Sequence, residues 1–232
     1  MLVERPRALF ALSACCPPNV VRTIAEVSNY VYSVSSEGLW LNLYDGNKLS
    51  TKLNDGSTLR LTRQTNYPWD GNNRLVFDET PEAPFSLYFR IPGWCHNTKV
   101  LLNGKLISTY KLSGSYAEIK RHWSKDGQLQ LTFDMPATLI EANPLVEETR
   151  NQVAVKRGPL VYCIESVDLN KKNSVFELTL SNNSHFKPAP LKINKGNVIN
   201  LETTAKKQER QIGKISCIKR YPKSLLKKSR SG

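Results

Sequence analysis

The first regular hydrophobic pattern in the chain lies between Pro17 and Ser33. Four apolar residues recur there at helical spacing: Val20, Ile24, Val27 and Val31. They predict a helix with one broad apolar face. Pro17 and Pro18 fit its first turn, where the amide that proline lacks has no partner within the helix. We expect this face to pack against another part of the protein, and to cause self-association or aggregation where it is left exposed.

After Gly38 the pattern changes to short alternating runs separated by turn residues, which is typical of an antiparallel β-sandwich. The predicted strands are 39–44, 59–65, 75–77, 85–91, 99–102, 116–121, 128–133, 153–156 and 160–165. Five dipeptides that accept tight turns stand between them: Asp45-Gly46, Asp55-Gly56, Asp70-Gly71, Asn103-Gly104 and Asp126-Gly127. The fold class is therefore mainly β, with one helix in front.

Composition and charge exclude some classes of protein. The chain has 232 residues, 40% of them hydrophobic, and no apolar run long enough for a membrane-spanning helix. The net charge of +13 is concentrated at the end, since residues 170–232 contain 15 Lys and Arg but only 3 Asp and Glu. We expect residues 169–232 to be a basic, weakly structured tail with one strand near 175–180. Because few aromatic residues accompany these lysines, no nucleic-acid partner is predicted.

The cysteines are the main candidates for chemistry. Their number is odd and their spacing irregular: Cys15, Cys16, Cys95, Cys163 and Cys217. This pattern favours a reducing compartment, such as the cytoplasm, over a disulfide framework. Cys15 and Cys16 directly precede the helix, whose positive end favours a thiolate that can attack or bind a metal. Two alternatives are buried thiols without chemistry, and lipidation of Cys15 after the sequence Leu12-Ser13-Ala14.

Several motifs, taken in order, resemble glycoside hydrolase family 127, the β-L-arabinofuranosidase family. They are Cys15-Cys16-Pro17-Pro18-Asn19, Gly38 to Tyr44, Tyr67-Pro68-Trp69-Asp70-Gly71, Arg90 to Cys95, Val100 to Gly104, Tyr116 with Arg121 and Trp123, and Arg157 to Cys163. The resemblance implies that residues 1–46 are the end of a catalytic (α/α)₆ barrel and that residues 47–168 are a β-sandwich middle domain.

The resemblance also implies a retaining mechanism at a zinc-thiolate centre. Cys15 would be the nucleophile, and Cys15 and Cys16 would bind zinc. The family's acid/base glutamate and its two other zinc ligands, a cysteine and a glutamate, lie upstream of the part that this chain matches. We therefore expect zinc in the intact enzyme but none in this chain alone, because a tetrahedral site needs its full ligand set.

The predicted function is that of a fragment of a glycoside hydrolase acting on β-L-arabinofuranosides or related plant glycans, inactive in isolation. It would be a truncated product or one part of a split enzyme. The alternative is a non-catalytic β-sandwich module that binds carbohydrate or docks onto a separately encoded barrel. The predicted partners are thus a carbohydrate substrate and a separate barrel.

Other prominent side chains have structural interpretations beside functional ones. Trp69, Trp94 and Trp123 either stack on sugars or close the ends of the sandwich. Arg90 and Arg157 are expected to pair with carboxylates between sheets or domains.

The lipidation alternative leads to the first prediction. After expression in a bacterium, mass spectrometry should find the peptide containing Cys15 unmodified, because Glu4 and the short apolar stretch fit a lipoprotein signal poorly. A diacylglycerol adduct on Cys15 would contradict the cytoplasmic interpretation.

Overall fold

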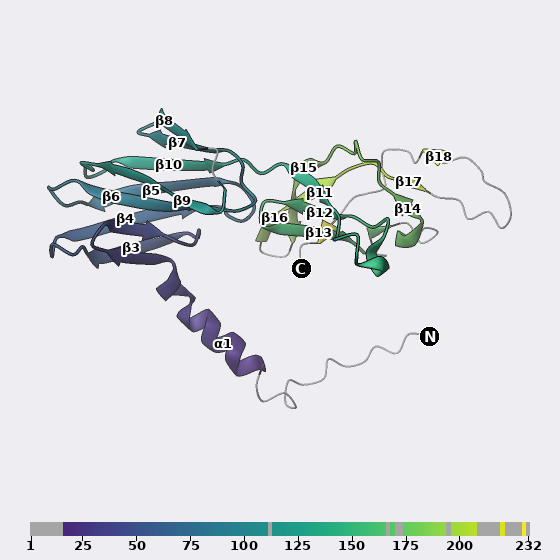
Figure 1. The fold of residues 1–232 in the computed structure, drawn as a ribbon, viewed down its shortest axis with the longest axis horizontal. Coiled ribbons are helices and arrows are strands. Elements are labelled where there is room, and N and C mark those ends of the chain that lie inside the picture. Colours follow the sequence, from purple (N-terminus) through teal and green to yellow (C-terminus); the bar gives the residue numbers. More distant parts are fainter. Residues whose placement is uncertain are drawn as a thin grey trace. The chain divides into compact units, whose positions relative to one another are not determined.

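The computed structural model describes residues 16–110, 113–165, 168–169, 174–193, 196–207, 219–220 and 229–230. These residues form two compact units, described here one at a time. The first unit comprises the described residues up to 65 together with those of 73–93 and 98–131. The second comprises residues 66–72, 94–97 and the described residues from 132 onward. Figure 1 shows the helix and the strands of both units.

The first unit begins with the helix α1 (Cys16–Glu26), followed by the 3₁₀ helix η2 (Val27–Tyr30). Within the described part of the chain, every residue of these two helices is at least partly exposed to solvent. The helix is shorter than the predicted range of 17–33, because Tyr32 and its neighbours pair with a strand instead. They form β1 (Tyr32–Ser35), which is antiparallel to β2 (Gly38–Leu41).

Two sheets make up the rest of the first unit. The four-stranded sheet has the order β1-β2-β6-β9, with β6 (Phe85–Ile91) and β9 (Ser115–Arg121). The six-stranded sheet has the order β3-β4-β5-β10-β7-β8. Its strands are β3 (Asn47–Lys52), β4 (Thr58–Thr65), β5 (Asn72–Glu79), β10 (Gln128–Phe133), β7 (Thr98–Leu102) and β8 (Lys105–Tyr110).

One strand pair departs from the expected antiparallel pattern. β2 and β6 lie parallel, with Trp40 opposite Tyr88. Between them the chain forms β3, β4 and β5 of the other sheet before it returns, and such a crossover permits a parallel neighbour. Gly38 is required at the start of β2 because a Cβ there would lie 2.1 Å from the Ser86 carbonyl oxygen.

Alternate side chains of both sheets form the core of the first unit. Leu39 and Leu41 from β2 and Leu87 and Phe89 from β6 have no solvent exposure. The same is true of seven apolar residues of the larger sheet: Leu59, Leu61, Leu75, Phe77, Val100, Leu129 and Leu131. Burying each such side chain contributes about 1.5–3 kcal/mol to folding. The predicted mainly-β fold with one N-terminal helix is thus confirmed.

The second unit also consists of small sheets. One has the order β11-β12-β13-β19, with β11 (Ala137–Ile140), β12 (Ala154–Arg157), β13 (Leu160–Ile164) and β19 (Ser229–Arg230). Another has the order β14-β17-β18, with β14 (Leu178–Thr179), β17 (Lys206–Lys207) and β18 (Lys219–Arg220). The 3₁₀ helices are η3 (Glu147–Thr149) and η5 (Val175–Glu177).

The segment after residue 169 contains more regular structure than its composition predicts. β15 (Lys187–Ile193) and β16 (Gly196–Glu202) form a two-stranded antiparallel sheet with seven paired positions. The strand expected at 175–180 is largely replaced by η5, where Ser174 and Glu177 form a capping box before the short β14. Among the described residues, no helix has the length and apolar character needed to cross a membrane.

The core leads to the second prediction. Phe77 is fully buried and stacks on Trp123 at 4.6 Å between ring centroids. Phe77→Ala should lower the free energy of unfolding by about 3–5 kcal/mol, because it leaves a cavity that the sheets cannot fill. Denaturant unfolding measures this loss. Phe176→Ala, at a side chain that is 92% exposed, is the control and should change it by about 0.5 kcal/mol or less. Similar values for both variants would contradict the assigned core.

Candidate functional site

The predicted cysteine site is only partly within the described chain. Cys15 lies outside the described residues, as does Cys217. Cys16 is the first residue of α1 and is exposed, and the first turn of that helix contains no acidic residue. Cys95 is buried, and its thiol donates to the Asn97 carbonyl oxygen at 3.3 Å. Cys163 is exposed on β13.

The described side chains do not fit a zinc centre. Among them there is no group of three or more His, Cys, Asp or Glu residues arranged to hold a metal ion. Cys16 alone cannot supply the four ligands that a structural zinc site needs. No metal-dependent step is therefore assigned to the described residues.

The second unit gathers several of the sequence motifs into one cluster. The rings of Tyr67 and Trp94 stack at 6.5 Å between centroids, and Trp94 meets Phe133 edge-on at 6.1 Å. Arg157 NH1 donates to the Trp69 carbonyl oxygen at 2.8 Å. Motifs that are far apart in the chain thus meet in one group of side chains. We call it the motif cluster; its members are Tyr67, Trp69, Trp94, Phe133 and Arg157.

Arg157 of this cluster also interacts with Tyr162. Burial raises the pKa of the Tyr162 phenol above its usual value, and the Arg157 guanidinium opposes that shift. Arg157 and Arg90 were both expected to pair with carboxylates, and this expectation is wrong. Within the described part of the chain they form no ion pair and instead donate to backbone carbonyls, Arg90 Nε to Asn42 at 2.6 Å.

Trp69, Trp94 and Trp123 differ in how far they are buried. Trp123 is 5% exposed, packs between Phe77 and Phe85, and donates from Nε1 to the Phe85 carbonyl oxygen at 3.1 Å. It therefore fills the sandwich and is unavailable to a sugar. Trp69 and Trp94 are half-buried in the motif cluster.

A cavity of about 850 Å³ lies in the second unit. Apolar side chains such as Val155, Phe186 and Leu201 make up most of its described lining, and Glu141 and Asp168 are its acidic members. This lining suits an apolar occupant better than hydrolytic chemistry.

The first unit presents a group of side chains that the sequence motifs did not single out. We call it the outer-face patch; its members are Ser33, Trp40, Asn42, Tyr88, Tyr116 and Glu118. The neighbours of these residues along β2, β6 and β9, such as Leu39, Leu87 and Ala117, are buried in the core. Strand alternation therefore puts the patch on the opposite face of the four-stranded sheet. The period-two pattern around Trp40 and Tyr88 was the available signal for it.

Hydrogen bonds fix the charge of the patch. Ser86 Oγ donates to Glu118 Oε1 at 2.6 Å, and the Tyr88 hydroxyl donates to the same oxygen at 3.1 Å. These two donors lower the pKa of the Glu118 carboxyl, so that it stays ionised near neutral pH. Partial desolvation and the adjacent carboxylate raise the pKa of Tyr88, which stays neutral.

A buried arginine supports the same unit from within. Arg63 is 2% exposed and lies over the rings of Tyr32 and Tyr44, at 5.1 and 5.7 Å from their centroids. Its Nε donates to the Asp45 carbonyl oxygen at 2.6 Å, while within the described part NH1 and NH2 have no hydrogen-bond partner. Burial lowers the pKa of this guanidinium. The arrangement joins β1 to β4 and the turn after Tyr44.

Comparison with known proteins identifies this architecture. Residues 38–135 match the model of the β-L-arabinofuranosidase GH127 middle domain, and residues 137–218 match that of the glycoside hydrolase family 127 C-terminal domain. Together the two matches span most of the chain. The protein therefore belongs to glycoside hydrolase family 127.

Individual relatives agree with this assignment. The chain is 32% identical over 159 residues to the non-reducing end β-L-arabinofuranosidase of Bifidobacterium longum subsp. longum. It also resembles the solved structure of a GH127 β-L-arabinofuranosidase from Geobacillus stearothermophilus T6, with a TM-score of 0.78 and 31% identity over 90% of this chain. A solved glycoside hydrolase matches with a TM-score of 0.81 and 36% identity over 95% of this chain.

The chain is much shorter than these relatives. It spans 24% of the Bifidobacterium protein, 33% of the Geobacillus chain and 38% of the other glycoside hydrolase.

The motif cluster leads to the third prediction. Arg157→Gln should destabilise the second unit by about 1.5–3 kcal/mol, because it removes a charge-assisted hydrogen bond to a half-buried carbonyl. Denaturant unfolding followed by tryptophan fluorescence measures this effect. Arg150→Gln removes an exposed ion pair with Glu147 and should cost less than about 1 kcal/mol. Equal losses in the two variants would refute the anchoring role of Arg157.

Proposed function

We propose that this chain is a β-rich fragment of a retaining glycoside hydrolase that acts on β-L-arabinofuranosides or related plant glycans, and that the fragment is inactive in isolation. The observation that carries the proposal is the match to both the middle and the C-terminal domain of family 127, over residues 38–135 and 137–218. The names of the Bifidobacterium and Geobacillus relatives supply the substrate class.

The proposal places the chemistry outside the described residues. Retaining hydrolysis needs a nucleophile opposite an acid/base carboxyl. By resemblance Cys15 would be that nucleophile, with Cys15 and Cys16 as two of the zinc ligands, and the remaining groups would come from a barrel. In such an enzyme, zinc would hold the thiolate deprotonated. We propose that the chain alone is silent and binds no zinc, and that it works in a reducing, cytoplasmic setting.

The fourth prediction follows from this assignment. The purified chain should release no p-nitrophenol from p-nitrophenyl β-L-arabinofuranoside and should contain well under one zinc per chain by elemental analysis. The Bifidobacterium relative, assayed in parallel, is the positive control. Turnover that disappears in Cys15→Ser and Cys16→Ser would instead mean that the chain itself completes the site.

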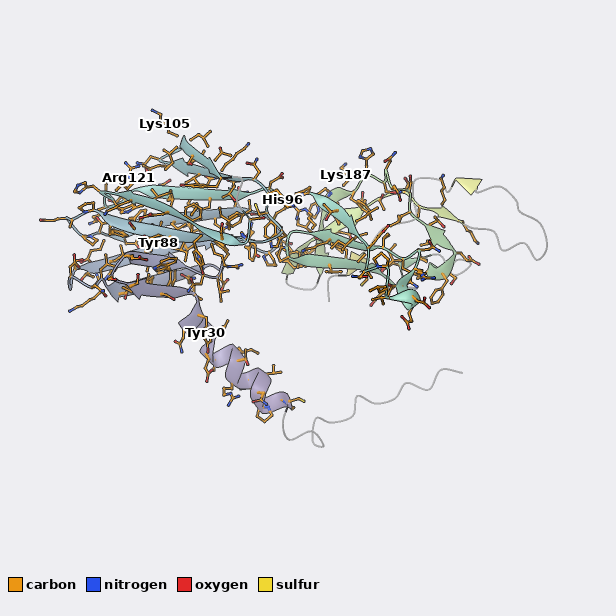
Figure 2. The ribbon with its side chains drawn as sticks, viewed as in Figure 1. Tyr30, Tyr88, His96, Lys105, Arg121 and Lys187 are labelled. Carbon is orange, nitrogen blue, oxygen red and sulfur yellow. The ribbon has the colours of Figure 1, made fainter. Side chains whose placement is uncertain are left out.

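A second role, docking onto a separately encoded barrel, is favoured by the apolar side of α1 and η2. Val20, Val21, Ile24 and Val27 are between 46% and 67% exposed, and Tyr30, labelled in Figure 2, is 60% exposed. An amphipathic helix that buries none of its residues leaves its apolar side available to another protein.

The fifth prediction tests this surface. The chain should bind a hydrophobic dye and self-associate in gel filtration, and Val21→Lys with Ile24→Lys should reduce both effects several-fold. Glu26→Lys, on the polar side of the helix, is the matched control and should leave both unchanged. A sharp monomer without dye binding would rule out α1 as a docking surface.

A further inference from the structure

The outer-face patch consists of rings that fix one another. Trp40 and Tyr88, opposite each other on the parallel strands β2 and β6, stack at 4.0 Å between centroids with their planes 10° apart. Tyr116 on β9 meets Trp40 edge-on at 5.0 Å and is 38% exposed. Exposed aromatic rings held this way lose little conformational freedom when a ligand packs against them.

Hydrogen bonds hold the polar side chains of the patch in fixed positions. The Tyr116 hydroxyl donates to Asn42 Oδ1 at 2.7 Å, and Asn42 Nδ2 donates to Ser33 Oγ at 2.8 Å. Trp40 Nε1 donates to Ser35 Oγ at 2.9 Å. On the other side of Tyr88, the Glu118 carboxylate accepts from Ser86 and Tyr88 through Oε1. The patch therefore offers hydroxyl, amide and carboxylate groups at fixed positions beside an exposed ring.

We propose that the outer-face patch binds a neutral oligosaccharide without hydrolysing it. A sugar ring would pack its C–H face on Tyr116, and its hydroxyls would donate to Glu118 and exchange hydrogen bonds with Asn42 and Ser33. This inference goes beyond the proposed catalytic role, because it assigns a separate binding site on β1, β2, β6 and β9. Only the choice of arabinose-containing probes rests on the proposed function.

Charge distinguishes this ligand from other classes. Glu37 and Glu118 act on Tyr88. Lys120 lies near Glu118, and Arg90 donates to the Asn42 carbonyl oxygen. These charges balance, so the patch offers no excess positive charge to the phosphates of nucleic acids or of anionic lipid surfaces. In the centre of a protein interface the Glu118 carboxylate would be desolvated and would need a cationic partner. Sugar hydroxyls satisfy a carboxylate by donating to it and carry no charge, which matches the mixture of rings and acceptors in the patch.

The test is affinity electrophoresis through gels containing debranched arabinan, with isothermal titration of soluble arabino-oligosaccharides. Tyr116→Ala should weaken binding about tenfold, and Tyr116→Phe, which keeps the ring, should retain most of the affinity. Glu118→Gln should weaken it about threefold, since a neutral amide is the poorer acceptor. Phe176→Ala, which removes an aromatic ring that is 92% exposed in the second unit, is the matched control and should bind as the unmodified chain does.

Each outcome decides the proposal. Retention of glycan that depends on Tyr116 and Glu118 supports it, with unchanged unfolding curves showing that the variants are folded. No retention of any glycan, or equal retention by all variants, overturns it. Self-association lost in Tyr116→Ala without glycan binding would assign the patch to a protein interface and also overturn it. Binding of xylo-oligosaccharides in place of arabino-oligosaccharides would support the patch but contradict the proposed substrate class.

Discussion

The burial of alternate side chains in β2 and β6 is the constraint on which the first unit depends. Leu39, Leu41, Leu87 and Phe89 are fully enclosed, and their burial contributes several kcal/mol in total. Because a strand has a period of two, the same register sends Trp40 and Tyr88 to the opposite face. A slip of one residue would expose the leucines and bury the polar partners of the patch. The core and the outer-face patch are therefore two consequences of one register.

Much of the first unit could be predicted because its signals are local. β6 and β10 begin and end where the alternation does, and Asn103 and Gly104 have the positive φ of 48° and 78° that their hairpin requires. The parallel pairing of β2 with β6 could not be predicted, because it depends on where distant strands lie. β15 and β16 were missed because their lysine, proline and asparagine content is weak evidence for strands.

The candidate sites also depend on contacts between distant parts of the chain, which the sequence does not reveal. Arg90 and Arg157 were assigned carboxylate partners, yet both donate to backbone carbonyls, which every residue carries and no sequence pattern marks. The patch residues extend from Ser33 to Glu118 and meet only through strand pairing and crossover. The position of Cys15 and Cys16 before the helix marked them as candidates, but their roles as nucleophile and zinc ligands come from the resemblance alone. The described structure adds only that Cys16 is exposed at the start of α1.

A glycan-binding face would serve a hydrolase in a specific way. An enzyme that removes terminal sugars acts only at chain ends, and a second binding site on the same molecule raises the effective concentration of those ends. Such a site must release its ligand quickly, because tight binding would slow movement between ends. The patch meets this condition, since Tyr116 is its most exposed ring and its polar groups already bond to one another, so each sugar contact replaces an existing interaction and yields only a small net gain.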